Sequence, residues 1–136
     1  MSKKLTPIAL AAAAAALATP AGAAGDEFAQ TWANVNICNP SQLGVRAQLA
    51  GDGSSADMQV RFTVQWLSPS GWAPVEGASS SPWQSAGSAE YTWGQAGWTF
   101  SLSVPPGYQY QLRGVAETNV NGKTSTLVTG SCAVGG

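Results

Sequence analysis

The sequence contains no histidine, and this absence removes the side chain that most often serves as general base, proton shuttle and metal ligand. Apart from two lysines near the N-terminus, only Lys123 is available as a base for a serine nucleophile, and no Gly-x-Ser-x-Gly motif is present. Two cysteines without histidine make a poor metal site. We therefore expect no enzymatic activity, no metal and no cofactor.

Charged residues are also scarce, at 10% of the chain, with Lys and Arg numbering 6 and Asp and Glu 7. No basic cluster is present, and this excludes nucleic acid as a partner, because neutralising phosphates takes grouped Lys and Arg. Hydrophobic residues make up 44% of the chain, which disfavours disorder. The composition predicts a folded domain with an uncharged polar surface.

The N-terminus has the pattern of a secretion signal. Two lysines precede an alanine-rich apolar run over residues 5–18, and Ala21–Ala23 supplies small residues for cleavage. The run is shorter than the roughly 20 residues that span a bilayer, and no second helix offers it a packing partner. We expect a cleavable signal peptide over residues 1–24, of bacterial type, and a secreted or periplasmic domain over 25–136 with no membrane span.

Cys38 and Cys132 lie near the two ends of that domain. An even pair of cysteines in an exported protein predicts a disulfide bond. Closing so long a loop contributes roughly 4–5 kcal/mol through the entropy of the unfolded chain.

Apolar and polar residues alternate with period two, the pattern of half-buried strands. The strongest runs are Met58–Trp66, Trp98–Val104 and Tyr108–Ala116, and weaker strands are expected over Trp32–Cys38, Val45–Leu49, Trp72–Val75, Glu90–Trp93 and Thr124–Val128. Asn121-Gly122 predicts a hairpin turn. The pattern predicts an all-β fold, a single antiparallel two-sheet sandwich of about seven or eight strands.

One stretch resembles a known family. Pro106–Ala116 followed by Asn121-Gly122 is similar to the F strand and F–G turn of a fibronectin type III domain. Phe62–Trp66 resembles the C strand of that family, and Trp72 resembles the start of its C′ strand. The resemblance implies an immunoglobulin-like sandwich.

It also implies a structural role for Tyr110, as the corner tyrosine whose hydroxyl bonds back to the preceding connection. Two positions depart from the family: Gly114 replaces a usual core valine, and Leu43–Leu49 lacks the B-strand tryptophan.

Tryptophan is unusually frequent for a chain of this length, with six residues. Trp66 and Trp98 fall on the apolar phase of strands and are expected in the core. Exposed aromatic rings favour binding and can stack on sugar rings. The candidate binding surface comprises Trp72, Trp83 and Trp93, with Gln84, Gln95 and Glu90 as partners for hydroxyl groups. The alternative is that these tryptophans fill the edges of the sandwich.

The carboxylates carry weaker signals. Glu90 and Glu117 are interpreted as solvated strand residues rather than an acid–base pair. Asp52 and Asp57 lie in a glycine-rich stretch that lacks the spacing of a calcium loop, and a turn explains them equally well.

Three functions remain. The first is a non-catalytic interaction, adhesion or structural domain at or outside the cell envelope, which binds another protein or the envelope itself. The second is a carbohydrate-binding module that uses the tryptophans on cell-wall or other polysaccharides. The third is an inhibitor of an extracellular hydrolase that presents the loop Ala78–Ser85. Fold analogy favours the first of these.

Overall fold

A computed structural model describes residues 30–136 as strands, turns and loops, without a helix in that range. The strands are β1 (Trp32–Asn39), β2 (Gln42–Ala50), β3 (Asp57–Ser68), β4 (Gly71–Pro74), β5 (Gln84–Ser88), β6 (Trp93–Ser101), β7 (Gln109–Val120), β8 (Lys123–Val128) and β9 (Cys132–Gly135). The all-β prediction is confirmed. The predicted signal peptide lies outside the described residues.

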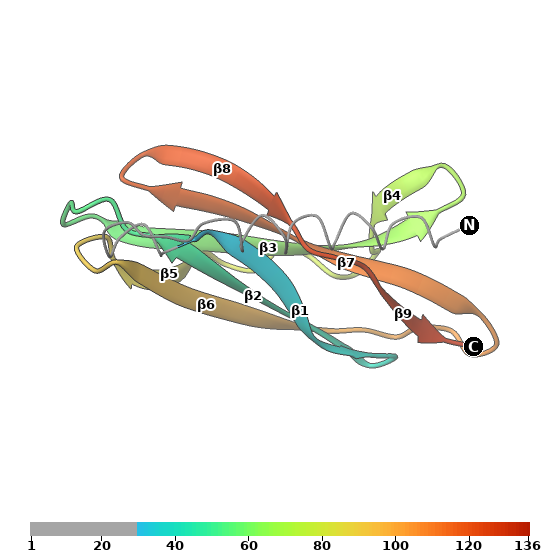
Figure 1. Ribbon diagram of the computed structural model, residues 1–136. Coiled ribbons are helices and arrows are strands. Elements are labelled where there is room, and N and C mark those ends of the chain that lie inside the picture. Colours follow the sequence, from blue (N-terminus) through green and yellow to red (C-terminus); the bar gives the residue numbers. More distant parts are fainter. Residues whose placement is uncertain (1–29) are drawn as a thin grey trace.

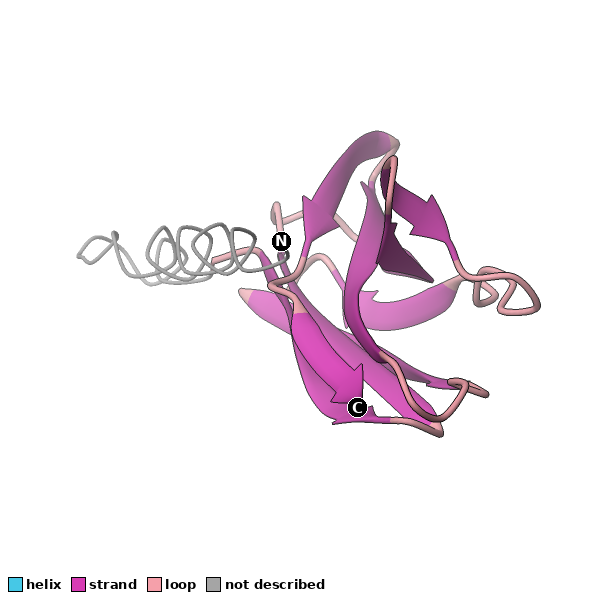
Figure 2. Cartoon of the chain, turned by 90° about the vertical axis from the view of Figure 1, so that its right-hand side faces the viewer, coloured by secondary structure: helices cyan, strands magenta, loops and turns pink. Residues whose placement is uncertain are grey.

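The strands form two antiparallel sheets. One has the order β1-β2-β6 and the other the order β4-β3-β7-β8, with β5 also paired to β3 and β9 to β7. Figure 1 shows the sheets as two layers, and Figure 2 shows them from one end of the molecule. The molecule is therefore a sandwich-like pair of sheets, with one solvent-facing surface on each.

The core follows from the alternation within the long strands. In β3 the residues Met58, Val60, Phe62 and Val64 are buried, and the polar residues between them face solvent. Strands β2 and β7 alternate in the same way. Each fully buried aliphatic or aromatic side chain contributes about 1.5–3 kcal/mol relative to exposure. Burial of these two inner faces holds the sheets together.

One predicted strand was wrong, one strand was missed, and the predicted number of strands was too low. Residues 89–92 form a turn instead of the strand expected over Glu90–Trp93, and β6 begins at Trp93. The strand in this region is β5, whose Ser- and Gly-rich sequence has the composition of a loop and which is held by pairing with the start of β3. Strands β8 and β9 both pair with β7 on either side of a break at residues 129–131. This break and β5 raise the number of strands in the described residues to nine.

The predicted hairpin turn between β7 and β8 is confirmed. Asn121 has φ 54° and Gly122 has φ 83°, the two positive values that a type I′ turn requires. The Asn119 side chain accepts a hydrogen bond from the Gly122 N–H at 3.0 Å. Local turn chemistry therefore fixes the register of this pair.

Candidate binding surfaces

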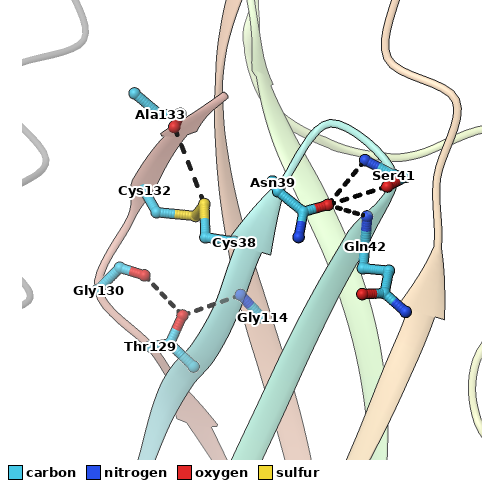
Figure 3. Close-up of a disulfide and its surroundings, with 9 residues drawn as sticks. All are labelled: Cys38, Asn39, Ser41, Gln42, Gly114, Thr129, Gly130, Cys132 and Ala133. Carbon is cyan, nitrogen blue, oxygen red and sulfur yellow. Dashed lines mark hydrogen bonds between the residues drawn. A yellow bond between two sulfur atoms is a disulfide. The ribbon is translucent and has the colours of Figure 1, made fainter. Parts of the chain in front are cut away.

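The two cysteines form the predicted disulfide, which joins the sheets (Figure 3). Cys38 belongs to β1 of the three-stranded sheet, and Cys132 begins β9 of the six-stranded sheet. Their Cα atoms lie 6.6 Å apart after a sequence separation of 94 residues. The bridge therefore links the first described strand to the last.

A bulge in β1 sets the direction of Cys38. Val35 pairs with the buried Val45, and the register then shifts so that Ile37 pairs with Gly44 and Cys38 with Leu43. The extra residue, Asn36, reverses the alternation for the rest of the strand. Cys38 consequently lies opposite the inward-facing Leu43, on the side that faces β9.

Trp72 lies on the outer face of the six-stranded sheet. It pairs with Leu67, next to the pair of Gln65 and Arg113. The Arg113 guanidinium carbon lies 4.3 Å from the centroid of the Trp72 ring, and its Nε donates to the Gln65 side chain at 2.8 Å. Partial burial lowers the pKa of Arg113. One face of this indole is therefore occupied by the protein's own cation.

Trp83 lies on the same outer face, with a similar partner. The Arg61 guanidinium carbon is 4.7 Å from its ring centroid, and Arg61 Nη2 forms an ion pair with Glu117 at 2.7 Å. Both charged side chains are substantially exposed, so the pair contributes at most about 1 kcal/mol. Glu117 is thus engaged by an arginine, and the Trp83 ring already carries a stacked cation.

The outer face of the three-stranded sheet has a different character. We call it the amide face, formed by residues whose pairing places them on this one side. It comprises Trp32, Asn34, Arg46, Gln48, Trp93, Gln95 and Thr99.

Trp93 is the most exposed tryptophan, at 52%, and among residues 30–136 it has no stacked ring or cation. Beside it, Gln95 Nε2 donates to Gln48 Oε1 at 2.9 Å, and Gln48 Nε2 donates to the Gln30 carbonyl at 2.9 Å. These bonds fix both amides and leave the carbonyl oxygen of Gln95 available as an acceptor. The amide face thus presents a solvent-exposed aromatic ring beside two side-chain amides whose positions are fixed by hydrogen bonds.

A hollow of about 470 Å³ extends this face toward the β1–β2 turn. It is lined by Asn36, Val45, Arg46, Gly97, Trp98 and Thr99, together with Gln84 from strand β5 of the other sheet. The lining thus combines one cation, an aliphatic and an indole side chain and several neutral hydrogen-bonding groups, and none of its residues is a carboxylate.

The candidate residues from the sequence divide between separate places. Trp93 and Gln95 share the amide face, whereas Trp72 and Trp83 lie on the opposite side of the molecule. Of the remaining two, Gln84 pairs with the inward-facing Val60, and Glu90 is exposed in the β5–β6 turn, where its N–H binds the Ser88 side chain. The three tryptophans therefore do not form one plane.

Sequence reasoning missed Arg46, Gln48 and Trp32 as members of a surface. Arg46 and Gln48 alternate with the buried Val45, Ala47 and Leu49, so the period of β2 contained this signal. Their position beside Trp93 depends on the pairing of β2 with β6, which no local pattern reveals.

Trp66 and Trp98 are partly buried against the core. The Trp66 ring meets Tyr110 edge-on at 5.9 Å, and Tyr110 lies 6.3 Å from the exposed Tyr108. No hydrogen bond from the Tyr110 hydroxyl is found within the part of the chain that the structure describes, so the expected corner bond is missing there. Its ring instead helps to line a cleft of about 630 Å³ at this end of the sandwich.

The two aspartates considered for calcium have separate partners. Asp52 accepts the Ser54 N–H at 2.9 Å, and hydrogen bonds from Ser54 lower the pKa of Asp52. Asp57 accepts the Ser85 hydroxyl at 2.6 Å. Across residues 30–136, no group of three or more metal-ligating side chains is found. In the same range, no helix has the length and apolar character needed to cross a membrane.

No protein-family model matches the chain, and no curated protein matches it. Among solved structures, the fold is similar to part of a glycosyl hydrolase family 2 member from Bacteroides cellulosilyticus, with a TM-score of 0.44 and 14% sequence identity. The match covers 74% of this chain and 14% of that one.

Proposed function

We propose that the chain is an exported, non-catalytic binding domain whose amide face binds a polysaccharide. The observation that carries the proposal is Trp93, which is 52% exposed, without a stacking partner in the described residues, and adjacent to the fixed pair of Gln48 and Gln95. An open indole stacks on the apolar face of a sugar ring. Side-chain amides beside the indole can donate hydrogen bonds to the hydroxyl groups of the same sugar and accept hydrogen bonds from them.

The fold supports a fibronectin type III or immunoglobulin-like classification. Such sandwiches place strands A, B and E in one sheet and C, F and G in the other. Strands β1, β2 and β6 here share one sheet, and β3, β7 and β8 share the other. The disulfide supports export, because structural disulfides persist in oxidising compartments.

The test is a titration of the purified protein with soluble polysaccharides and cell-wall fragments. Binding is measured by tryptophan fluorescence and by calorimetry. We expect saturable binding that Trp93→Ala abolishes. Trp83→Ala is the matched control, because it removes an exposed tryptophan from the opposite sheet and is expected to leave affinity unchanged. Thermal melts of both variants verify the fold. Loss of binding only in Trp83→Ala would move the site to the six-stranded sheet, and no binding by the wild type would refute the proposal.

A protein partner is the second candidate, supported by the aromatic cluster at the cleft. Tyr108 is 65% exposed beside Tyr110, whose ring also contacts Trp66, and aromatic residues are enriched in protein interfaces. Capture of a defined envelope protein that Tyr108→Ser prevents, while Trp93→Ala permits it, would support this function.

The inhibitor hypothesis receives no support from the shape of its loop. Ser81, in the middle of Ala78–Ser85, is buried, and its N–H and hydroxyl bond the backbone of Phe62 in β3. This segment lies along the edge of β3 instead of projecting as a protease-binding loop.

A further inference from the structure

We infer that the polysaccharide bound by the amide face carries carboxylate groups, as uronic acids do, and that Arg46 recognises them. This inference rests on the proposed function, and it adds the chemical class of the ligand. Three observations carry it: the isolation of the Arg46 charge, the hollow around its guanidinium, and its distance from Trp93.

Arg46 is the single charged residue in the sequences of β1, β2 and β6. Its side chain is exposed, and within residues 30–136 it has no ion-pair partner. By contrast, Arg61 is bound to Glu117 and Arg113 is bound to Gln65, and each also covers a tryptophan. A guanidinium without a carboxylate neighbour is free to bind an anionic ligand.

The Arg46 guanidinium lies over Gly97, and both residues line the hollow. Arg46 pairs with Gly97 of β6, and a Cβ atom placed at Gly97 would lie 3.8 Å from the Arg46 guanidinium carbon. The guanidinium thus lies across a strand position that has no side chain. Asn36 and Thr99 line the same hollow of about 470 Å³ and supply further hydrogen-bonding groups. A planar guanidinium fork matches a carboxylate in two-pronged geometry.

The spacing of the two binding groups sets the size of the ligand. Trp93 lies four residues before Gly97 on β6, which corresponds to about 13 Å along a strand. A sugar ring stacked on Trp93 and a carboxylate at Arg46 therefore belong to different residues of one extended saccharide. Gln48 and Gln95 lie between them, where hydroxyl groups of the same chain would pass.

The molecule as a whole does not attract such a ligand, because its formal net charge, Arg46 included, is −1. An acidic saccharide is thus selected by a local contact and not by a general field. The affinity for an acidic chain should consequently fall with salt, whereas the affinity for a neutral chain should not.

The decisive probe is a matched pair of ligands, oligomers of polygalacturonate and the same oligomers with their carboxylates methyl-esterified. We expect the wild-type protein to bind the acidic form at least about tenfold more tightly, the ratio that one charge-assisted contact supplies. Arg46→Gln should bind both forms equally. Lys123→Gln removes the same charge from the other sheet and should keep the preference.

Every outcome of this experiment is informative. Equal affinity of the wild type for both forms would overturn the inference and leave polysaccharide binding intact. A preference that survives in Arg46→Gln would also overturn it, by placing recognition elsewhere. Failure of the wild type to bind either form, together with a flat response to neutral polysaccharides, would refute the proposed function itself.

Discussion

At the scale of single residues, Gly114 shows how closely the two sheets approach. It lies on the inward face of β7, and a Cβ atom built there would be 2.6 Å from Cγ2 of Val45 in the opposite sheet. Its N–H donates to the Thr129 hydroxyl at 2.9 Å, and its carbonyl accepts the Thr129 N–H at 3.0 Å. Thr129 is buried at the break between β8 and β9, where it closes the space beside the glycine. Val45 and Thr129 thus occupy the space that a side chain at position 114 would need.

Gly114→Ala should destabilise the protein by about 1–3 kcal/mol, because a methyl group added to a filled core forces its neighbours to move. Chemical denaturation of the wild type and the variant measures this difference. The matched background is Val45→Ala, which removes the two methyl groups nearest the new atom. In the Val45→Ala background, Gly114→Ala should lower the free energy of unfolding by clearly less than it does in the wild type. An equal cost in both backgrounds would show that contact with Val45 is not the cause.

At the scale of strands, the alternation of residue types predicts the long elements well. Strands β3 and β7 could be predicted because each buries one face along twelve residues. Strand β5 could not, since Gln84–Ser88 contains little beyond small and polar residues and is a strand only because β3 offers it hydrogen bonds. A bulge could not be predicted for a related reason. Whether a residue is unpaired depends on the register of the neighbouring strand, which the local sequence does not contain.

The bulge at Asn36 allows a direct test of strand phase. Deleting Asn36 together with Ile37 should place Cys38 opposite Gly44, so that Cys38 points outward and cannot reach Cys132. We expect two titratable thiols per chain in this double-deletion variant under denaturing, non-reducing conditions, against none in the wild type.

The control is the deletion of Asn36 alone, which removes only the extra residue, leaves Cys38 opposite the inward-facing Leu43 and should keep the disulfide. If the double-deletion variant still forms the intramolecular bridge, the strand must have found another register, and the phase argument would be wrong.

At the scale of the whole molecule, the path of the chain decides which tryptophans lie together. Trp72 and Trp83 flank β3, whereas Trp93 opens β6 after the chain has crossed to the other sheet. Although the three tryptophans are evenly spaced in the sequence, two of them lie on the outer face of the six-stranded sheet and the third lies on the opposite outer face. The composition could predict that aromatic residues were in surplus, but the amide face exists only after β1, β2 and β6 have paired. The arginines that cover Trp72 and Trp83 likewise come from β7 and β3.

The disulfide acts at this same scale, because it closes nearly the whole described chain into one loop. For a separation of 94 residues, the loss of unfolded-state entropy corresponds to about 4–5 kcal/mol. A domain of ordinary size has a free energy of unfolding of about 5–15 kcal/mol, so the double variant Cys38→Ser, Cys132→Ser should lose a large part of its stability.

Denaturant unfolding of that double variant measures the loss, and the reduced wild type provides the matched control, since both lack the covalent link. Binding should respond differently from stability. Cys38 lies at the β1–β2 turn, and Trp93 lies at the far end of the same sheet, opposite Ala50. At a temperature where the variant remains folded, its affinity for a polysaccharide should equal that of the wild type. A matching loss of affinity would mean that the bridge shapes the amide face itself, and unchanged stability would mean that the unfolded chain is already restricted by other contacts.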